Sequence, residues 1–376
     1  MGSAYNDVPR PLSTRLAAPR PGKAMTKMML SRPVAAALLA AALFGASTPF
    51  AKQLVGQTSP FLLAGLLYLG SGIGLNLIRI VRDRSLQLPT MPASEWWWWL
   101  GAVIFGGVLG PLLLMFGLVQ TTASTASMLL NLEAVLTALL AWVVFKENAD
   151  RRIVAGMLLI VAGGLLLSWS STGHGEGSWI GPVAIGGACL CWAIDNNLTR
   201  KVSAQDALFL AGGKGAVAGV INTALGLAIG AAWPSWAQAM PAMLIGLLGY
   251  GISLVLFVLA LRGLGTARTG AYFSTAPFIG AAIAILCFGE HASTMFWLAA
   301  ALMGAGVWLH LTERHEHEHT HEAMLHAHRH VHDEHHQHEH DFDWDGTEPH
   351  THPHQHTPIT HTHPHYPDIH HRHGHA

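Results

Sequence analysis

The sequence predicts an all-α membrane protein in which ten transmembrane helices form two inverted five-helix repeats. The first observation is composition, because 51% of the 376 residues are hydrophobic and only 11% are charged. The second is that apolar runs recur through most of the chain, each with the roughly 20 residues that a helix needs to cross a bilayer. The third is that basic residues occur in alternate loops. A soluble protein with an ordinary buried core does not have this composition.

Breaks between the apolar runs place the helices in order. Residues 1–32 form a basic N-terminal segment that we expect to be disordered and cytoplasmic, and residues 312–376 form a disordered polar tail. Glycines at four-residue intervals, beginning at Gly106 and at Gly215, allow neighbouring helices to pack closely in lipid. The predicted spans are 33–52, 60–81, 97–119, 122–145, 152–170, 178–199, 207–231, 241–261, 267–289 and 293–311.

Basic residues mark one side of the membrane. Up to residue 311, Lys and Arg lie before the first span or around the loops that follow every second span, and Lys52 and Lys214 are the exceptions. Cytoplasmic loops of membrane proteins carry an excess of Lys and Arg. We therefore expect a multi-pass protein of the plasma (inner) membrane with both termini in the cytoplasm. Losing or adding one helix would exchange the sides of all later loops, so the alternation also supports an even number of spans.

Two segments of the chain are similar to each other. AVLTALLAWVVFKEN (134–148) and PFIGAAIAILCFGEH (277–291) are apolar helices rich in small residues, and each ends in an aromatic residue followed by a glutamate. Upstream of them, TTASTASMLL matches GTARTGAYFS. The copies cover residues 33–170 and 178–311 with five spans each, so the second copy is inverted relative to the first.

These features, together with CWAIDNNLTRK in the first helix of the second copy, resemble the EamA family of the drug/metabolite transporter superfamily over about residues 33–311. The resemblance implies a ten-helix permease that carries a small metabolite, amino acid or drug, often outward. Inverted repeats imply alternating access, in which one half rocks against the other around a central site. Glu133 departs from the family pattern, because many members have an apolar residue or a proline there.

Ionisable residues within the predicted spans are candidates for the transport site, because a charge at membrane depth is costly unless it faces a cavity or a partner. Glu133 lies near the centre of the fourth span, where it could take and release a proton as access alternates. The alternative is a protonated, purely structural glutamate. The other candidate cavity residues are polar: Asn131, Thr137, Asn196, Asn222, Tyr272 and Ser274.

Asp195 and Lys214 lie on consecutive antiparallel spans, each about ten residues from the centre of the loop between them. Their depths therefore match, and we expect them to face each other or to share a water-filled vestibule, because pairing offsets part of the desolvation cost of both. The alternative is an ion pair that only clamps the helical hairpin.

The tail has a different composition from the rest of the chain. It holds 23 of the 26 histidines, which alternate with acidic residues in stretches such as HEHEHTH. Imidazole binds zinc, nickel and cobalt, and a flexible chain with closely spaced ligands forms several exchangeable chelates. We expect the cytoplasmic tail to bind a divalent metal, Zn, Ni or Co; no other cofactor is required, and a merely solvated, pH-titrating tail is the alternative. The predicted ligands are His315, His317, His319, His321, His330, His332, His335, His336, His338 and His340.

The sequence favours a proton-coupled secondary transporter that exports a small organic solute and has a metal-binding tail. A divalent-metal permease or exporter fed by the tail is the alternative. No histidine occurs in a predicted span before His310, but the alternative stays open because four other residues within the spans could serve as ligands: Glu133, Asp195, Cys189 and Cys191. A membrane-anchored metal sensor is a minor alternative. An enzyme is not expected, because no loop collects a nucleophile, a base and an orienting group. The expected partners are the lipid bilayer, the small-molecule or ion substrate and divalent metal ions, without nucleic acid, and a homodimer is left open.

Overall fold

The structure, a computed structural model, describes residues 32–84, 91–145, 151–172, 179–202, 205–312, 316–321, 324–330, 350–356 and 359–364. The predicted disorder of the N-terminal segment concerns residues that lie outside these ranges, except for the last of them. Within the ranges, nine helices are long and apolar enough to cross a membrane. The predicted all-α membrane fold is therefore confirmed.

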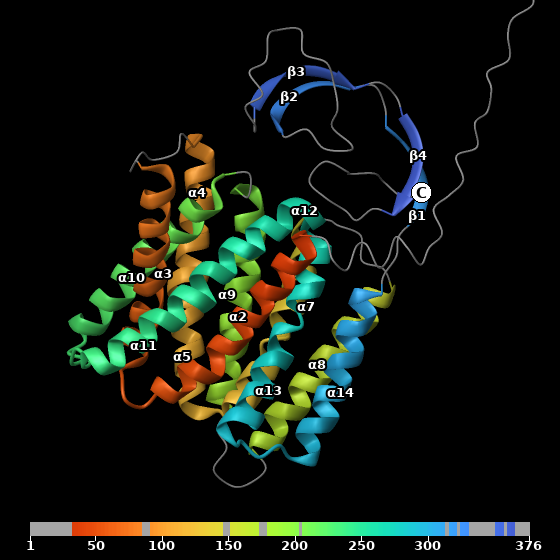
Figure 1. The fold of residues 1–376 in the computed structure, drawn as a ribbon. Helices are drawn as coiled ribbons and strands as arrows, with labels where there is room; N and C mark the ends of the chain where they lie inside the picture. Colours follow the sequence, from red (N-terminus) through yellow and green to blue (C-terminus); the bar gives the residue numbers. More distant parts are fainter. Residues whose placement is uncertain are drawn as a thin grey trace, which may run out of the picture.

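The first repeat contains seven α-helical segments and one π-helical segment (Figure 1). They are α2 (Arg32–Leu54), α3 (Pro60–Asp83), α4 (Ala93–Ala102), η1 (Val103–Leu109), α5 (Gly110–Gln120), α6 (Ala123–Leu129), α7 (Leu132–Phe145) and α8 (Arg151–Thr172). The elements of the second repeat are α9 (Ile180–Val202), α10 (Ala207–Ala228), α11 (Trp236–Gly246), η2 (Leu247–Ile252), α12 (Ser253–Phe273), α13 (Ala276–Phe288) and α14 (Thr294–Leu311). They follow the same order, except that α12 is continuous where the first repeat has the separate helices α5 and α6.

Nine of the predicted spans match the nine apolar helices closely, and the other matches α9. α9 has 23 residues, but it carries Asp195, Arg200 and Lys201 and is less apolar than the nine. It packs against α4, α5 and α7 in the centre of the bundle. One predicted loop is wrong, because α12 is helical through residues 262–266. The glycines there permit a break in a helix but do not require one.

The two repeats pack around an approximate twofold relation. α3 lies along α10 and α8 lies along α14, which are pairs of corresponding helices, while α2 packs on α12 as α9 packs on α5. Glycine backbones make the closest of these contacts. A Cβ on Gly156 of α8 would lie 2.8 Å from the carbonyl oxygen of Gly306, and a Cβ on Gly306 of α14 would lie 2.6 Å from that of Gly156. Corresponding helices therefore touch backbone to backbone, as small residues allow in lipid.

Interruptions occur at corresponding places in both repeats. Each third helix contains a π-helical segment, η1 or η2, in glycine-rich sequence, and π segments are frequent at functional sites. Each fourth helix is also broken. The break between α6 and α7 falls at Leu130 and Asn131, and the break between α12 and α13 falls at Ser274 and Thr275. Broken helices at membrane depth place polar backbone and side chains next to a protein-enclosed site.

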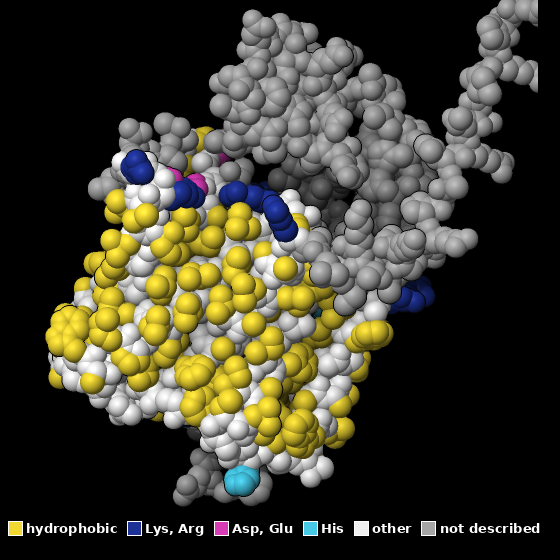
Figure 2. All heavy atoms as spheres, viewed as in Figure 1, with side chains coloured by type: hydrophobic (Ala, Val, Ile, Leu, Met, Phe, Trp, Pro, Cys, Tyr) yellow, Lys and Arg dark blue, Asp and Glu magenta, His cyan; other side chains and the backbone are white. Residues whose placement is uncertain are grey.

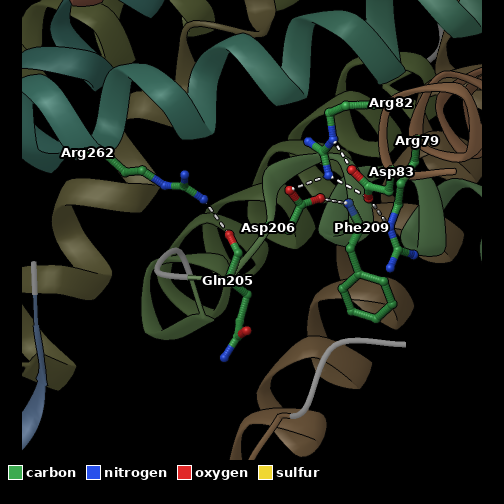
Figure 3. Close-up of polar contacts among 7 residues, drawn as sticks. All are labelled: Arg79, Arg82, Asp83, Gln205, Asp206, Phe209 and Arg262. Carbon is green, nitrogen blue, oxygen red and sulfur yellow. Dashed lines mark hydrogen bonds and ion pairs between the residues drawn. The ribbon is translucent and has the colours of Figure 1, made fainter. Parts of the chain in front are cut away.

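Charge is separated along the bundle. Figure 2 shows a hydrophobic surface around its middle, with Lys and Arg side chains gathered at the upper end in this view. At this basic end Arg82 of α3 bonds Asp206 Oδ2 at 2.9 Å, and Asp206 Oδ1 accepts from the N–H of Phe209 at 2.8 Å (Figure 3). Arg262 of α12 donates to the carbonyl of Gln205. These contacts join α3 to the α9–α10 connection and to α12.

At the opposite end of the bundle, helices are joined by hydrogen bonds between side chains and backbone groups. Both oxygens of Glu290, just after α13, accept hydrogen bonds from the N–H groups of Ala123 and Ser124 at 2.8 Å each. A carboxylate at the N-terminus of α6 satisfies donors that the helix leaves unpaired. Lys52 of α2 donates to the carbonyl of Leu118, a group near the C-terminus of α5. This bond gives Lys52 a specific partner where the charge pattern of the loops would not place a lysine.

The tail forms two antiparallel strand pairs in its described residues. β1 (Glu316–His321) pairs with β4 (Ile359–Pro364), and β2 (Met324–His330) pairs with β3 (His350–His356). In these four segments the structure differs from the predicted disorder. Histidine at alternate positions has the two-residue period of a strand, and the sequence analysis used that period only as a ligand spacing.

Candidate functional site

A cavity lies between the two repeats at the level of the interruptions. The centres of water-sized molecules can occupy about 60 Å³ of it. A single water needs roughly 10–15 Å³ by the same measure, so the space suits a small solute. Its lining comes from α2, α3, α7, α9, α10, η2 and α12, and its polar residues are Tyr68, Glu133, Asp195, Asn196, Lys214, Tyr250 and Ser253.

Asp195 and Lys214 form a buried ion pair in this lining. Lys214 Nζ donates to Asp195 Oδ2, and the side chains are 5% (Lys214) and 8% (Asp195) exposed. The other oxygen, Oδ1, accepts from the Thr199 hydroxyl at 3.0 Å. The contact expected from the matched depths of the two residues is confirmed. Each charge compensates the desolvation of the other, so removing either one would leave an unpaired charge in a dry interior.

Gly106 of η1 lies directly against the ion pair. A Cβ at this position would lie 2.0 Å from Asp195 Oδ2 and 2.6 Å from Lys214 Nζ, so only glycine fits. The carbonyl of Gly106 accepts from the Tyr68 hydroxyl at 2.7 Å and from Trp192 Nε1 at 3.1 Å. The π segment thus presents a bare backbone to the ion pair and a carbonyl to two aromatic donors.

Glu133 occupies the first turn of α7, directly after the break. Its Oε1 accepts from Asn196 Nδ2 at 2.8 Å, and the same amide lies 3.4 Å from the Thr137 hydroxyl. Glu133 and Thr137, one helical turn apart in α7, therefore both lie beside Asn196 across the α7–α9 interface. Asn196 follows Asp195 directly in α9, so the carboxyl group and the ion pair border the same cavity. The role of each in transport stays a prediction.

Aromatic rings form most of the remaining lining. Phe44 is their hub: its ring centroid lies 5.7 Å from that of Trp192, 5.9 Å from that of Tyr250 and 5.2 Å from that of Phe273. Phe257 continues the chain of rings, with its centroid 5.0 Å from that of Phe273. The ring centroid of Tyr250 also lies 5.4 Å from that of Tyr68. Within the described part of the chain, the buried hydroxyl of Tyr250 has no hydrogen-bond partner.

Five of the predicted cavity residues do not line the cavity: Thr137 contacts the lining residue Asn196, and the other four lie elsewhere. Asn131 donates to the carbonyl of Met128 and lies 3.8 Å from the sulfur of Met303 in α14, so it points away from the cavity. Asn222 supports η1 by donating to the Gly107 carbonyl at 3.2 Å. Tyr272 and Ser274 lie at the α12–α13 break and bond within it. The carbonyl of Tyr272 accepts from Thr275, and the hydroxyl of Ser274 donates to Gly270. They share the membrane depth of the site but not its surface.

The aromatic lining and the role of Gly106 were not predicted from the sequence. Aromatic residues inside spans are equally expected against lipid, and Gly106 was interpreted as a helix-packing residue. A usable signal was the position of Phe44, Tyr68 and Tyr250 well inside their spans, because aromatic anchors concentrate at the membrane interfaces.

A metal-binding cluster is not found in the described parts of the chain, where no three or more His, Cys, Asp or Glu side chains come together. The predicted ligands His315, His332, His335, His336, His338 and His340 lie outside the described residues. His317, His319 and His321 are in β1 and His330 is in β2. Metal binding by the tail therefore stays a prediction.

Comparisons with known proteins agree with the two-repeat architecture. The profile of the EamA-like transporter family matches residues 31–169 and 179–312. A protein of Methanothermobacter thermautotrophicus, named as an uncharacterized transporter, is 25% identical over 281 residues, which cover 71% of this chain and 82% of that protein. A protein of known crystal structure matches with a TM-score of 0.58 over 73% of this chain and 95% of its own, at 18% sequence identity. The structural match bears on the fold alone, and the two profile matches coincide with the two repeats.

Proposed function

Because the chain belongs to the EamA-like transporter family and is a membrane transporter of small solutes, we propose that it is a secondary transporter that exports an organic solute in exchange for protons. The site is the cavity between the repeats. The carboxyl group of Glu133 carries the coupling proton. The basic end of the bundle faces the cytoplasm, α9 crosses the membrane with the nine apolar helices, and both termini are cytoplasmic.

The position of Glu133 is the observation that carries this proposal. A carboxyl group at membrane depth is costly, and such groups mark substrate or proton pathways. Glu133 lies on the cavity wall, and its described hydrogen bond is to the neutral amide of Asn196 rather than to a cation. That amide can donate to the carboxylate, and it can also donate to the carbonyl oxygen of a protonated Glu133. Both protonation states therefore have a hydrogen-bonding solution at the same place.

The transport cycle follows from competition at this carboxyl group. In the cytoplasm-facing state the solute binds, and Glu133 releases its proton. In the outward-facing state a proton returns to Glu133, and the solute leaves. Asp195 and Lys214 neutralise each other, so this pair can stay buried in both states without a change in charge. The duplicated interruptions and the glycine contacts between corresponding helices let one repeat rock against the other.

The tail, in this proposal, binds a divalent metal in the cytoplasm. It modulates transport or buffers the metal, and it does not form part of the transport path. Its composition supports metal binding. In the β1–β4 pair, His317 is opposite His363 and His319 is opposite His361 in the backbone register.

Proton flux in proteoliposomes tests the proposal. The purified full-length protein is reconstituted with a pH-sensitive dye inside, and small amines, carboxylates, neutral solutes and the divalent ions Zn²⁺, Ni²⁺ and Co²⁺ are added in turn. We expect proton movement driven by an organic solute and abolished in Glu133→Gln. Glu290→Gln, a matched change outside the cavity, should retain the coupling. Proton movement driven by the metal ions alone would support the metal-permease alternative and overturn the proposal.

A further inference from the structure

The cavity has an unequal charge balance. Its ionisable carboxylates and ammonium group are Glu133, Asp195 and Lys214, all in the described part of the chain. Lys214 is already engaged by Asp195 and packed over Gly106, so that pair contributes no net charge. With Glu133 ionised, the lining therefore carries one net negative charge. A solute that supplied a positive charge would balance it, whereas an anion would face two carboxylates and a lysine that is already paired.

The rest of the cavity wall is largely aromatic, which favours an organic cation. Phe44, Trp192, Tyr250, Phe257 and Phe273 form one connected set of rings along the cavity. The faces of aromatic rings carry partial negative charge, and aromatic residues that line a binding site attract ammonium groups that have lost their water. A bare metal ion gains little there, because it needs several oxygen, nitrogen or sulfur ligands. Among the described residues, no group of three or more His, Cys, Asp or Glu side chains could hold such an ion.

We propose that the solute of this site is a small organic cation, an ammonium group carrying an apolar body, held between the ring set and the carboxylate of Glu133. This inference rests on the proposed function and names its substrate class. The volume of the cavity limits the body to a few carbon atoms around the ammonium group. Exchange of such a cation for a proton keeps the charge of the cavity constant, because each of the two balances Glu133 in turn.

Three molecules of the same shape test the charge preference directly. Choline, its neutral isostere 3,3-dimethylbutan-1-ol and the anion 3,3-dimethylbutanoate differ mainly in charge. Their dissociation constants are measured by saturation-transfer NMR on the full-length protein in lipid nanodiscs. We expect choline to bind at least about tenfold more tightly than the alcohol, and the anion most weakly. Equal binding of choline and the alcohol, or tighter binding of the anion, overturns the inference without requiring any variant.

Two variants assign the preference to its source. Glu133→Gln should remove most of the preference of choline over the alcohol, and Phe44→Leu should reduce it severalfold. Phe61→Leu is the matched control, because Phe61 packs on Phe116 and does not line the cavity. A preference that survives both Glu133→Gln and Phe44→Leu would show that the cation binds elsewhere and would overturn the assignment.

The two proposals fail in distinguishable ways. If choline binds as expected but no organic cation moves protons in proteoliposomes, the proton-coupled function fails and the cation site stands. If neutral or anionic solutes move protons through Glu133 while choline shows no advantage, the function stands and the cation site fails.

Discussion

The two repeats share a scaffold but differ in their chemistry. Each third helix has a π segment, and each fourth helix is broken midway. When the two copies are aligned from Pro33 and Pro182 without a gap, Ala46 corresponds to Asp195. In the fourth helices Ala276 corresponds to Glu133. The two carboxyl groups of the cavity are thus each present in one repeat only, at positions where the other repeat has alanine.

This difference separates two requirements of alternating access. Two conformations of similar energy are needed, and a duplicated scaffold provides them because either half can adopt the arrangement of the other. One solute at a time is bound, so the chemistry near the pseudo-twofold relation is required only once. We expect substitutions of the cavity residues that occur in only one repeat to abolish the coupling of solute and proton movement. Substitutions in the features that both repeats share should alter stability or transport rate. The following experiments test that division.

The largest effect is expected from the ion pair. Asp195→Ala leaves the ammonium group of Lys214 buried without its partner, which should lower the free energy of unfolding by about 3–5 kcal/mol and stop transport. Asp195→Ala combined with Lys214→Met should restore most of the stability. Unfolding in mixed micelles and flux in proteoliposomes measure the two quantities.

The double variant also decides the role of the pair. Restored stability without transport indicates that the charges take part in transport. If flux returned together with stability, Asp195 and Lys214 would be only a clamp of the α9–α10 hairpin. Arg82→Ala is the control, because its pair with Asp206 is partly exposed and should contribute no more than about 1 kcal/mol.

The next effect concerns coupling alone. Glu133→Gln keeps an oxygen that can accept from Asn196, so we expect the free energy of unfolding to change by less than about 1 kcal/mol. Solute-driven proton movement should disappear. Thr137→Val, which removes the neighbouring hydroxyl 3.4 Å from Asn196, should retain coupling. Undiminished coupling in Glu133→Gln would exclude this residue as the proton carrier.

Glu290 allows the same substitution on the shared scaffold. Its carboxylate bonds two backbone N–H groups at the start of α6, and Glu290→Gln retains only one good acceptor. We expect a loss of about 1–2 kcal/mol in the free energy of unfolding and a severalfold change in transport rate, with the number of protons per solute unchanged. A changed stoichiometry would place Glu290 with the cavity chemistry instead.

The smallest effect on transport is expected at the tail. A variant that ends at Thr312 lacks 23 of the 26 histidines. We expect it to lose the binding of Zn²⁺, Ni²⁺ and Co²⁺ measured by isothermal titration calorimetry, while solute-driven proton flux in metal-free buffer stays within about twofold. Equal metal binding by the full-length and shortened proteins would refute the tail as the metal site.

Depth and helical period predicted part of the site. The meeting of Asp195 with Lys214 followed from their equal distance to one loop, and the meeting of Glu133 and Thr137 with Asn196 is consistent with the helical period. Both arguments use distances along regular helices, which the sequence determines. These arguments did not predict the position of Asn131, because the break between α6 and α7 turns its side chain toward α14.

The aromatic wall was beyond such arguments. Phe44 meets Tyr250 and Phe273 only because α2, from the start of the chain, packs against the continuous η2–α12 helix of the second repeat. Contact of this kind depends on helix packing, which hydropathy does not encode. Gly106 is a further example: its four-residue spacing to Gly110 suggested contact between helices, whereas the structure uses its missing side chain to seat two charges.

The charged character of α9 has a consequence for biosynthesis. With Asp195, Arg200 and Lys201 in 23 residues, this helix is a poor candidate to leave the translocation machinery for lipid by itself. Its aspartate acquires a counter-ion only when Lys214 of α10 has also been made. We therefore expect the two segments to enter the bilayer together as a hairpin, so that nascent chains halted before residue 214 hold α9 less firmly than longer ones.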